Sequence, residues 1–223
     1  MDIQRTEEET VEHLKQWFRE NGLALVLGIV IGLSGIAGVR YWFSYQRTQA
    51  EEASLIYDKV SNALAAQQYQ DVILTGKQLQ DDYSGTSYAV LATMAMAKAS
   101  HATGDVAAAR THLNWVMEKA DDKGLQHIAR IRLARLMIDA KDYTAAMKLI
   151  TDQDHGAFGS LYEELRGDIL VAQDNSSLAR EAYRSAIVGA AETTRRQFIQ
   201  MKLDNLASDI KLDTSTAAEE TKK

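Results

Sequence analysis

The sequence predicts an all-α fold, in which a single N-terminal transmembrane helix precedes a stack of helical hairpins. Three observations predict it: an uncharged apolar run near the N-terminus, helical apolar periodicity after Arg47, and turn residues that recur at a nearly constant spacing. Composition agrees with this fold class. The chain of 223 residues contains no proline, which an all-β protein of this size would normally use in turns and at strand edges.

Several function classes are excluded or disfavoured by the residue types present. The chain has no cysteine, so thiol enzymes, CxxC redox sites and cysteine-rich zinc modules are excluded. A net charge of -6 argues against a nucleic-acid partner, which needs a basic stripe. The histidines lack HExxH spacing, and the cluster Asp152, Asp154 and His155 is interpreted as a polar turn before Gly156. We expect no enzyme activity and no catalytic residue, cofactor or metal.

The first element is a membrane anchor over residues 22–43, preceded by an acidic cytoplasmic tail at 1–21. The run GLALVLGIVIGLSGIAGV carries no charge and spans roughly 27 Å as a helix, close to the thickness of the bilayer core. Aromatic residues flank it at Trp17 and Phe18 and again at Tyr41–Phe43, as membrane interfaces favour. A soluble amphipathic helix would show a polar stripe, and a buried core helix is the alternative. A cleaved signal peptide fits poorly, because the first 21 residues are acidic and no A-x-A site follows the run.

Charges give only a weak indication of orientation. Three basic residues lie on each side of the apolar run, so the positive-inside rule is almost balanced. The free amino terminus adds a small preference for a cytoplasmic N-terminus, with the long C-terminal part exported.

Small residues recur along one face of the anchor, at spacings of four, four and three. They are Ala24, Gly28, Gly32 and Gly35. This pattern is typical of membrane helices that pack closely against another helix. The alternative is that glycine is simply frequent in membrane spans.

A helical repeat is predicted over residues 44–207. Three segments align with the same offsets from a small residue to a turn, to an alanine and to a bulky residue. Their members are Ala97, Gly104, Ala109 and Leu113; Ala134, Lys141, Ala146 and Ile150; and Gly167, Asp174, Ala179 and Tyr183. This is the pattern of tetratricopeptide repeats at positions 8, 15, 20 and 24, because small residues let the paired helices approach and the bulky one fills the core. A weaker unit precedes, with its turn near Gln67; an irregular α-bundle is the alternative.

A concave groove is the candidate binding surface of such a stack. Helix A of each repeat exposes positions 2, 5, 9 and 12 there, which gives Leu91, Met94, Lys98 and His101; Ile128, Ile131, Arg135 and Ile138; and Leu161, Glu164, Asp168 and Val171. Because position 5 carries Met, Ile and Glu, we expect no basic clamp for a carboxylate. The mixed lining favours extended or apolar protein segments. The alternative is that these residues pack against the protein's own last helix, expected from about Thr193 to Ala207.

The polar C-terminal end, residues 208–223, lacks apolar periodicity and is predicted to be a disordered tail.

The arrangement of tail, anchor and weak repeats resembles the YfgM family of Gram-negative bacteria. The resemblance covers nearly all of residues 1–207. It is carried by ENGLAL at 20–25, GVRYWFSYQ at 38–46, IRLARLMI at 131–138, LRGDIL at 165–170 and QMKLDNLA at 200–207. The family has no defined catalytic residues to carry over.

The resemblance implies an ancillary subunit of the SecYEG translocon in the bacterial inner membrane. It implies a cytoplasmic N-terminus, periplasmic repeats, the membrane-anchored chaperone PpiD as a partner, and the passing of emerging client polypeptides to periplasmic chaperones. A regulatory link to a stress response at the cytoplasmic side is also implied. The alternative from another functional class is a structural scaffold of a different envelope assembly that binds no client.

Overall fold

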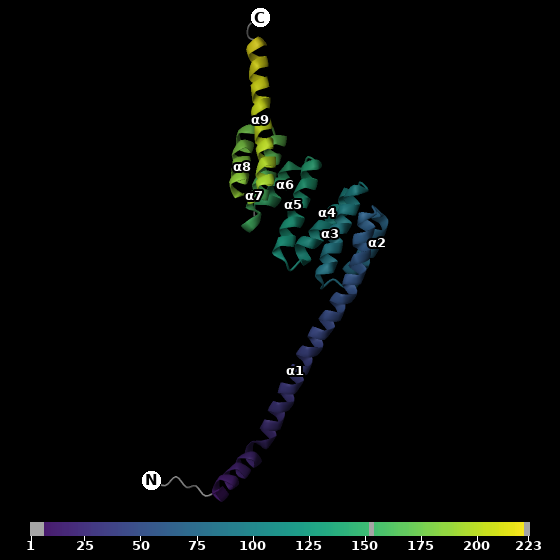
Figure 1. Ribbon diagram of the computed structural model, residues 1–223, viewed down its shortest axis with the longest axis vertical. Helices are drawn as coiled ribbons and strands as arrows, with labels where there is room; N and C mark the ends of the chain where they lie inside the picture. Colours follow the sequence, from purple (N-terminus) through teal and green to yellow (C-terminus); the bar gives the residue numbers. More distant parts are fainter. Residues whose placement is uncertain (1–6, 152–153, 221–223) are drawn as a thin grey trace, which may run out of the picture. The chain divides into compact units, whose positions relative to one another are not determined.

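The computed structural model describes the backbone of residues 7–151 and 154–220 and the side chains of residues 11–151 and 154–206. Within these ranges the chain forms helices and no strand, which confirms the all-α prediction. The helices are α1 (Glu7–Ala65), α2 (Tyr69–Asp82), α3 (Ser87–Ala102), α4 (Val106–Lys119), α5 (Lys123–Asp139), α6 (Tyr143–Thr151), η1 (Gly156–Phe158), α7 (Gly159–Ala172), α8 (Ser176–Gly189) and α9 (Thr193–Glu220) (Figure 1).

The chain divides into two compact units, residues 1–52 and 53–223. The first unit contains most of α1. Among the described residues, α1 is the one helix that is long and apolar enough to cross a membrane. The apolar side chains of this segment are exposed, as expected for a surface that lipid covers. The described part of the predicted tail, residues 7–21, and the anchor therefore belong to one continuous helix.

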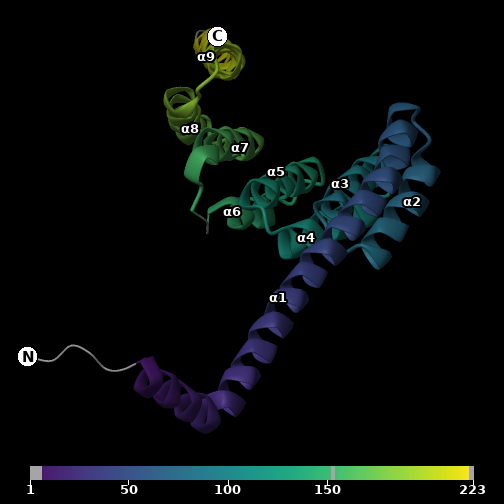
Figure 2. The same ribbon diagram turned by 60° about the horizontal axis from the view of Figure 1, so that its bottom comes forward.

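The second unit consists of helical hairpins with nearly identical connections (Figure 2). Four turn residues adopt a left-handed conformation: Gln67, Gly104, Lys141 and Asp174, with φ between 57° and 83°. Each donates its N–H to the carbonyl three residues earlier, and the next residue donates to the carbonyl five residues earlier, as Asp105 N does to Ser100 O at 2.8 Å. These are Schellman caps. Their recurrence confirms the three predicted repeats and makes the weaker unit at Gln67 a fourth.

Hydrophobic clusters tie each hairpin to the helix that follows it. One cluster joins the end of α1 and α2 with α3, and the next joins α3 and α4 with α5. A third joins α5 and α6 with α7, and the last joins α7 and α8 with α9. Because every hairpin completes its core with the next helix, the unit has one continuous core, as in other repeat proteins.

Burial supports the predicted register. The residues at positions 8 and 20 of the three predicted repeats are small and inaccessible, for example Ala134 and Ala146 at 0% exposure. In the last repeat the fit is closest, because a Cβ built on Gly167 would lie 2.4 Å from the Tyr183 ring. In the weaker repeat, whose turn is at Gln67, a small residue replaces the bulky one: Gly76 stands at position 24, and Met96 of α3 fills the space beside it.

The last helix differs from the expectation in length. It begins at Thr193 as predicted, but its backbone remains helical to Glu220, beyond the expected end at Ala207. The side chains of residues 207–220 and all of residues 221–223 lie outside the described residues. The disordered tail at 208–223 therefore stays a prediction.

Candidate functional site

The first candidate surface is the small-residue face of the anchor. All four members of the predicted face are exposed along α1. A Cβ built on Gly28, Gly32 or Gly35 would meet nothing within 4 Å among the described residues. The face is accessible, and its small side chains leave the backbone open to close approach by another helix.

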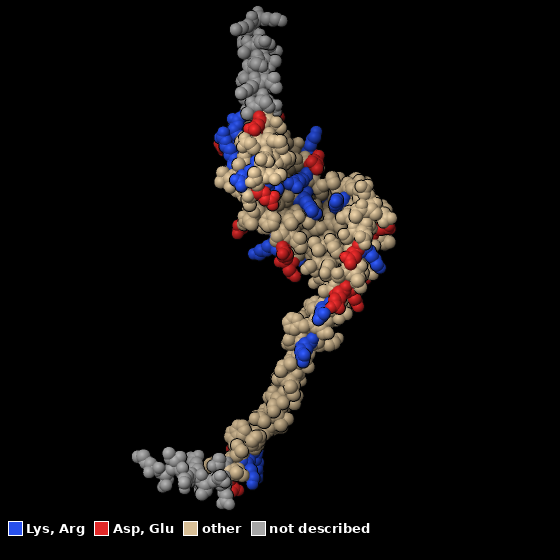
Figure 3. Space-filling view, in the orientation of Figure 1, with Lys and Arg blue, Asp and Glu red and all other residues tan. Residues whose placement is uncertain are grey.

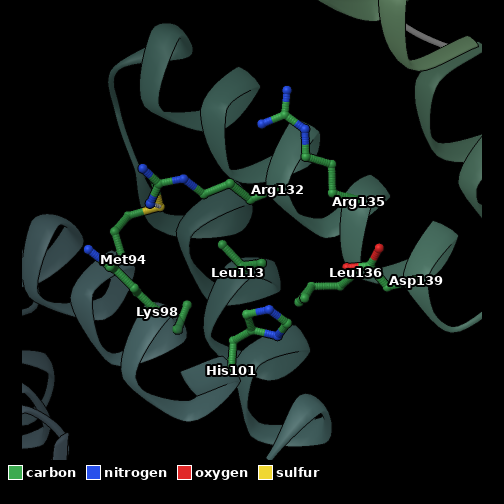
Figure 4. A pocket seen from close by; sticks show the side chains of 9 residues that line it. Met94, Lys98, His101, Leu113, Arg132, Arg135, Leu136 and Asp139 are labelled. Atoms are coloured by element: carbon green, nitrogen blue, oxygen red, sulfur yellow. Dashed lines mark hydrogen bonds between the residues drawn. The ribbon is translucent and has the colours of Figure 1, made fainter. Parts of the chain in front are cut away.

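The second candidate surface is a pocket between α3 and α5, which we call the open groove. It has a volume of about 410 Å³. Its lining residues are Met94, Ala97, Lys98 and His101 of α3, Leu113 of α4, and Arg132, Arg135, Leu136 and Asp139 of α5 (Figure 4). Spacings of three and four residues place these side chains on one face of each helix.

Cations without a carboxylate partner characterise the open groove. No ion pair joins Lys98, Arg132 or Arg135 to an acidic side chain among the residues whose side chains are described. Among the described residues, the one hydrogen bond of the Arg132 side chain reaches the Met94 sulfur at 3.9 Å, and a thioether is a weak acceptor. Burial, and then repulsion by Arg135, lowers the pKa of Arg132. Figure 3 shows Lys and Arg side chains gathered beside a hollow over α5.

In the corresponding region of the last repeat, basic side chains of α9 neutralise acidic side chains of α7. We call this region the closed groove; its members are Glu164, Asp168, Tyr183, Arg195 and Lys202. Glu164 of α7 is only 3% exposed. Its two carboxylate oxygens accept hydrogen bonds from Arg195 at 2.5 Å and from Lys202 at 2.9 Å. Lys202 also donates to both oxygens of Asp168, at 2.7 and 2.8 Å. Arg195 and Lys202 are two turns apart on α9 and therefore share a face.

Tyr183 of α8 completes the closed groove. Its hydroxyl donates to Asp168 Oδ1 at 2.7 Å, and its ring lies against Gly167. Burial raises the pKa of Tyr183, and its hydrogen bond to the carboxylate raises it further. The hydroxyl thus remains a hydrogen-bond donor at neutral pH.

The predicted groove residues divide between these two environments. Met94, Lys98, His101 and Arg135 line the open groove. Glu164 and Asp168 belong to the closed groove, where the expected alternative of packing against the last helix holds. Ile131 is buried in the core between α5 and α7, and Leu91 does not line the open groove.

Three basic residues line the open groove, although the sequence led us to expect no basic clamp there. That expectation considered only position 5 of each repeat. The cations lie elsewhere: Lys98 and Arg135 both occupy position 9, and Arg132 occupies position 6. Arg132 reaches the groove because the side chains of α3 and α5 face one another across it. The pairing of position 9 in two successive repeats was visible in the sequence, whereas the contribution of position 6 was not.

The polar turn near Gly156 is occupied by local contacts. His155 Nε2 lies 2.6 Å from the Ile150 carbonyl oxygen, and Asp154 Oδ1 accepts from the Gly156 amide at 3.2 Å. Asp152, the third member of the predicted cluster, lies outside the described residues. No group of three potential metal ligands occurs among the residues that the structure describes.

Stacked helical hairpins with Schellman turns, small residues at the hairpin contacts and a concave groove define a tetratricopeptide-type protein. A family model described as a tetratricopeptide repeat-like domain matches residues 15–208. The chain belongs to this family, and its apolar helix makes it a membrane-anchored member.

Relatives agree with the resemblance to the YfgM family. The chain is 28% identical over 207 residues to the ancillary SecYEG translocon subunit of Escherichia coli (strain K12), covering 93% of this chain and 100% of that protein. Proteins of the same name from Haemophilus influenzae and Neisseria gonorrhoeae are 29% and 25% identical, each covering 90% of this chain and 97% of the relative. No solved structure matches the chain.

Proposed function

We propose that the chain is an ancillary subunit of the SecYEG translocon, which it contacts through its membrane helix. The observation that carries the proposal is the similarity to subunits of that name along almost the whole chain, anchor and repeats together. A scaffold or repeat protein of another kind would share the repeats but not the anchor in the same place.

The anchor supports the proposal through its accessible small-residue face. Between membrane helices there is little hydrophobic driving force, so association depends on close packing of small residues. Gly28 and Gly32 offer such a surface along one face of α1.

The repeats supply the second part of the proposed role. The N-terminus lies in the cytoplasm and the repeats in the periplasm, where they bind emerging secretory polypeptides and transfer them to chaperones. The membrane-anchored chaperone PpiD is the proposed partner in this transfer. A regulatory role at the cytoplasmic side rests on the family resemblance alone. The open groove supports polypeptide binding, because it is accessible and bordered by both apolar and charged side chains.

Co-purification of the translocon with a double Gly28→Leu, Gly32→Leu variant tests the docking surface. Both changes increase hydrophobicity, so membrane insertion should persist while close helix approach is lost. The matched control is Val26→Leu, Val30→Leu, which adds apolar volume at the same spacing on another face. We expect recovery of SecY to fall several-fold for the glycine variant only.

Equal recovery with both variants would show that the small-residue face is not the contact. Absence of SecY even with the unaltered chain, together with recovery of a cell-wall or division complex, would refute the proposed function and favour the scaffold alternative.

A further inference from the structure

We propose that the open groove binds an acidic, extended segment of polypeptide. Carboxylates of this segment pair with Lys98, Arg132 and Arg135, and a neighbouring apolar side chain lies over Met94 and Leu136. The proposal rests on the proposed function and specifies the kind of sequence that the repeats recognise.

Charge is the first argument. The chain as a whole is acidic, with a net charge of -6, yet three cations line one pocket. Some carboxylates elsewhere in the repeats pair with cations: Glu163 pairs with Arg166, and Glu164 with Arg195. In the open groove Asp139 is the one acidic lining residue against three cations. A bound carboxylate would relieve the repulsion between Arg132 and Arg135 and satisfy guanidinium donors.

The lining of the groove is the second argument. Met94, Ala97, Leu113 and Leu136 form apolar parts of its wall. Its volume of about 410 Å³ accommodates a few side chains of an extended peptide. No Phe, Tyr or Trp side chain lines it, so it lacks the extended aromatic platform with which proteins bind single-stranded nucleic acid.

The closed groove is the third argument, because it shows how this molecule satisfies charges at the same repeat position. Position 9 is Asp168 in α7, and there Lys202 of α9 supplies the opposite charge. Position 9 is Lys98 in α3 and Arg135 in α5, and neither has a carboxylate partner among the described residues. A segment that completes the open groove must therefore carry negative charge, as α9 presents positive charge to the closed one.

Fluorescence anisotropy with the full chain in nanodiscs of neutral lipid tests the proposal. The probe is a short labelled peptide of alternating Glu and Leu, compared with a peptide in which Gln replaces Glu. We expect the Glu peptide to bind about tenfold or more tightly, and Arg132→Gln, Arg135→Gln to weaken its binding by a similar factor. The control is Lys148→Gln, Arg184→Gln, which removes the same charge from exposed sites on α6 and α8. This control should change affinity less than about twofold.

Equal binding of the two peptides, or equal weakening by the groove and control variants, would overturn the proposal. Vesicles of phosphatidylcholine with and without phosphatidylglycerol separate a lipid from a peptide ligand. Loss of vesicle binding in the groove variant, with peptide binding unchanged, would assign the cations to anionic lipid and also overturn it. Parallel co-purification keeps the two proposals distinct: retained SecY without peptide binding refutes this inference alone, whereas loss of SecY refutes the proposed function.

Discussion

The open and closed grooves are built from equivalent repeat positions but reach opposite electrostatic states. In the closed groove, a carboxylate that is 3% exposed accepts hydrogen bonds from two cations of α9. In the open groove, Lys98, Arg132 and Arg135 lie on the same face. Among the described residues, their one side-chain acceptor is the Met94 thioether, which accepts from Arg132. The comparison shows that each repeat presents the same face of its first helix. In the closed groove the side chains of α9 pair with this face, whereas in the open groove it remains accessible.

This difference separates stability from binding. A buried charge that loses its partner is strongly destabilising, so the closed groove contributes to holding α9 in place. The cations of the open groove are exposed and lack a carboxylate partner among the described residues, so they contribute little to folding and remain available to a ligand.

A charge at a hairpin contact should disrupt either region. Ala109→Arg in the repeat of the open groove and Ala146→Arg between the two grooves each place a guanidinium where the native side chain is 0% exposed. We expect each to lower the free energy of unfolding by more than about 4 kcal/mol, measured by urea denaturation. Thr144→Arg, at an exposed site of α6, is the control. An unaltered denaturation curve for either alanine variant would show that the repeat register is wrong.

Removing the shared cation should distinguish the closed groove. Lys202→Met leaves Glu164 with Arg195 alone and Asp168 with Tyr183. We expect a loss of about 2 kcal/mol, because Glu164 and Asp168 each lose a charge-assisted hydrogen bond but keep one other donor. The exposed Lys148→Met should have little effect. A loss no larger than that of the control would mean that α9 is held by apolar packing without help from these charges.

The turns offer a change of opposite sign. Lys141 and Asp174 adopt positive φ, which costs a residue with a side chain about 1 kcal/mol. Gly104 adopts positive φ without this cost, because glycine has no Cβ. Lys141→Gly should therefore raise the free energy of unfolding by up to about 1 kcal/mol, and Gly104→Ala should lower it by a similar amount. If Lys141→Gly destabilises the repeat unit, the side chain at this turn has a role that its backbone conformation does not reveal.

The smallest effect is expected in the open groove. Arg135→Gln removes one of two mutually repelling guanidinium groups, so the free energy of unfolding should change by less than about 0.5 kcal/mol. A loss above about 1 kcal/mol, measured as for Lys202→Met, would show that Arg135 has a structural role. The contrast between the two grooves would then disappear.

Much of this fold was readable from the sequence because its constraints are local. The anchor follows from an uncharged run, and the repeats follow from small residues that recur at fixed offsets from a turn. Lys141, which adopts positive φ, was found as a turn only through that spacing, because lysine is not a residue type that favours this conformation. The ion pairs of Glu164 could not be predicted from the sequence, because its partners Arg195 and Lys202 lie 31 and 38 residues further along the chain. Arg132 was missed because it lies outside the four positions expected to face the groove.

The most direct test of the account is site-specific photocrosslinking at Lys98 in cells that are exporting a secretory protein. The account predicts adducts between the newly made polypeptide and a photoreactive residue at position 98, and none at Lys148, which is exposed on α6. Adducts of equal yield at both positions, or none at position 98 while the polypeptide crosses the membrane, would contradict it.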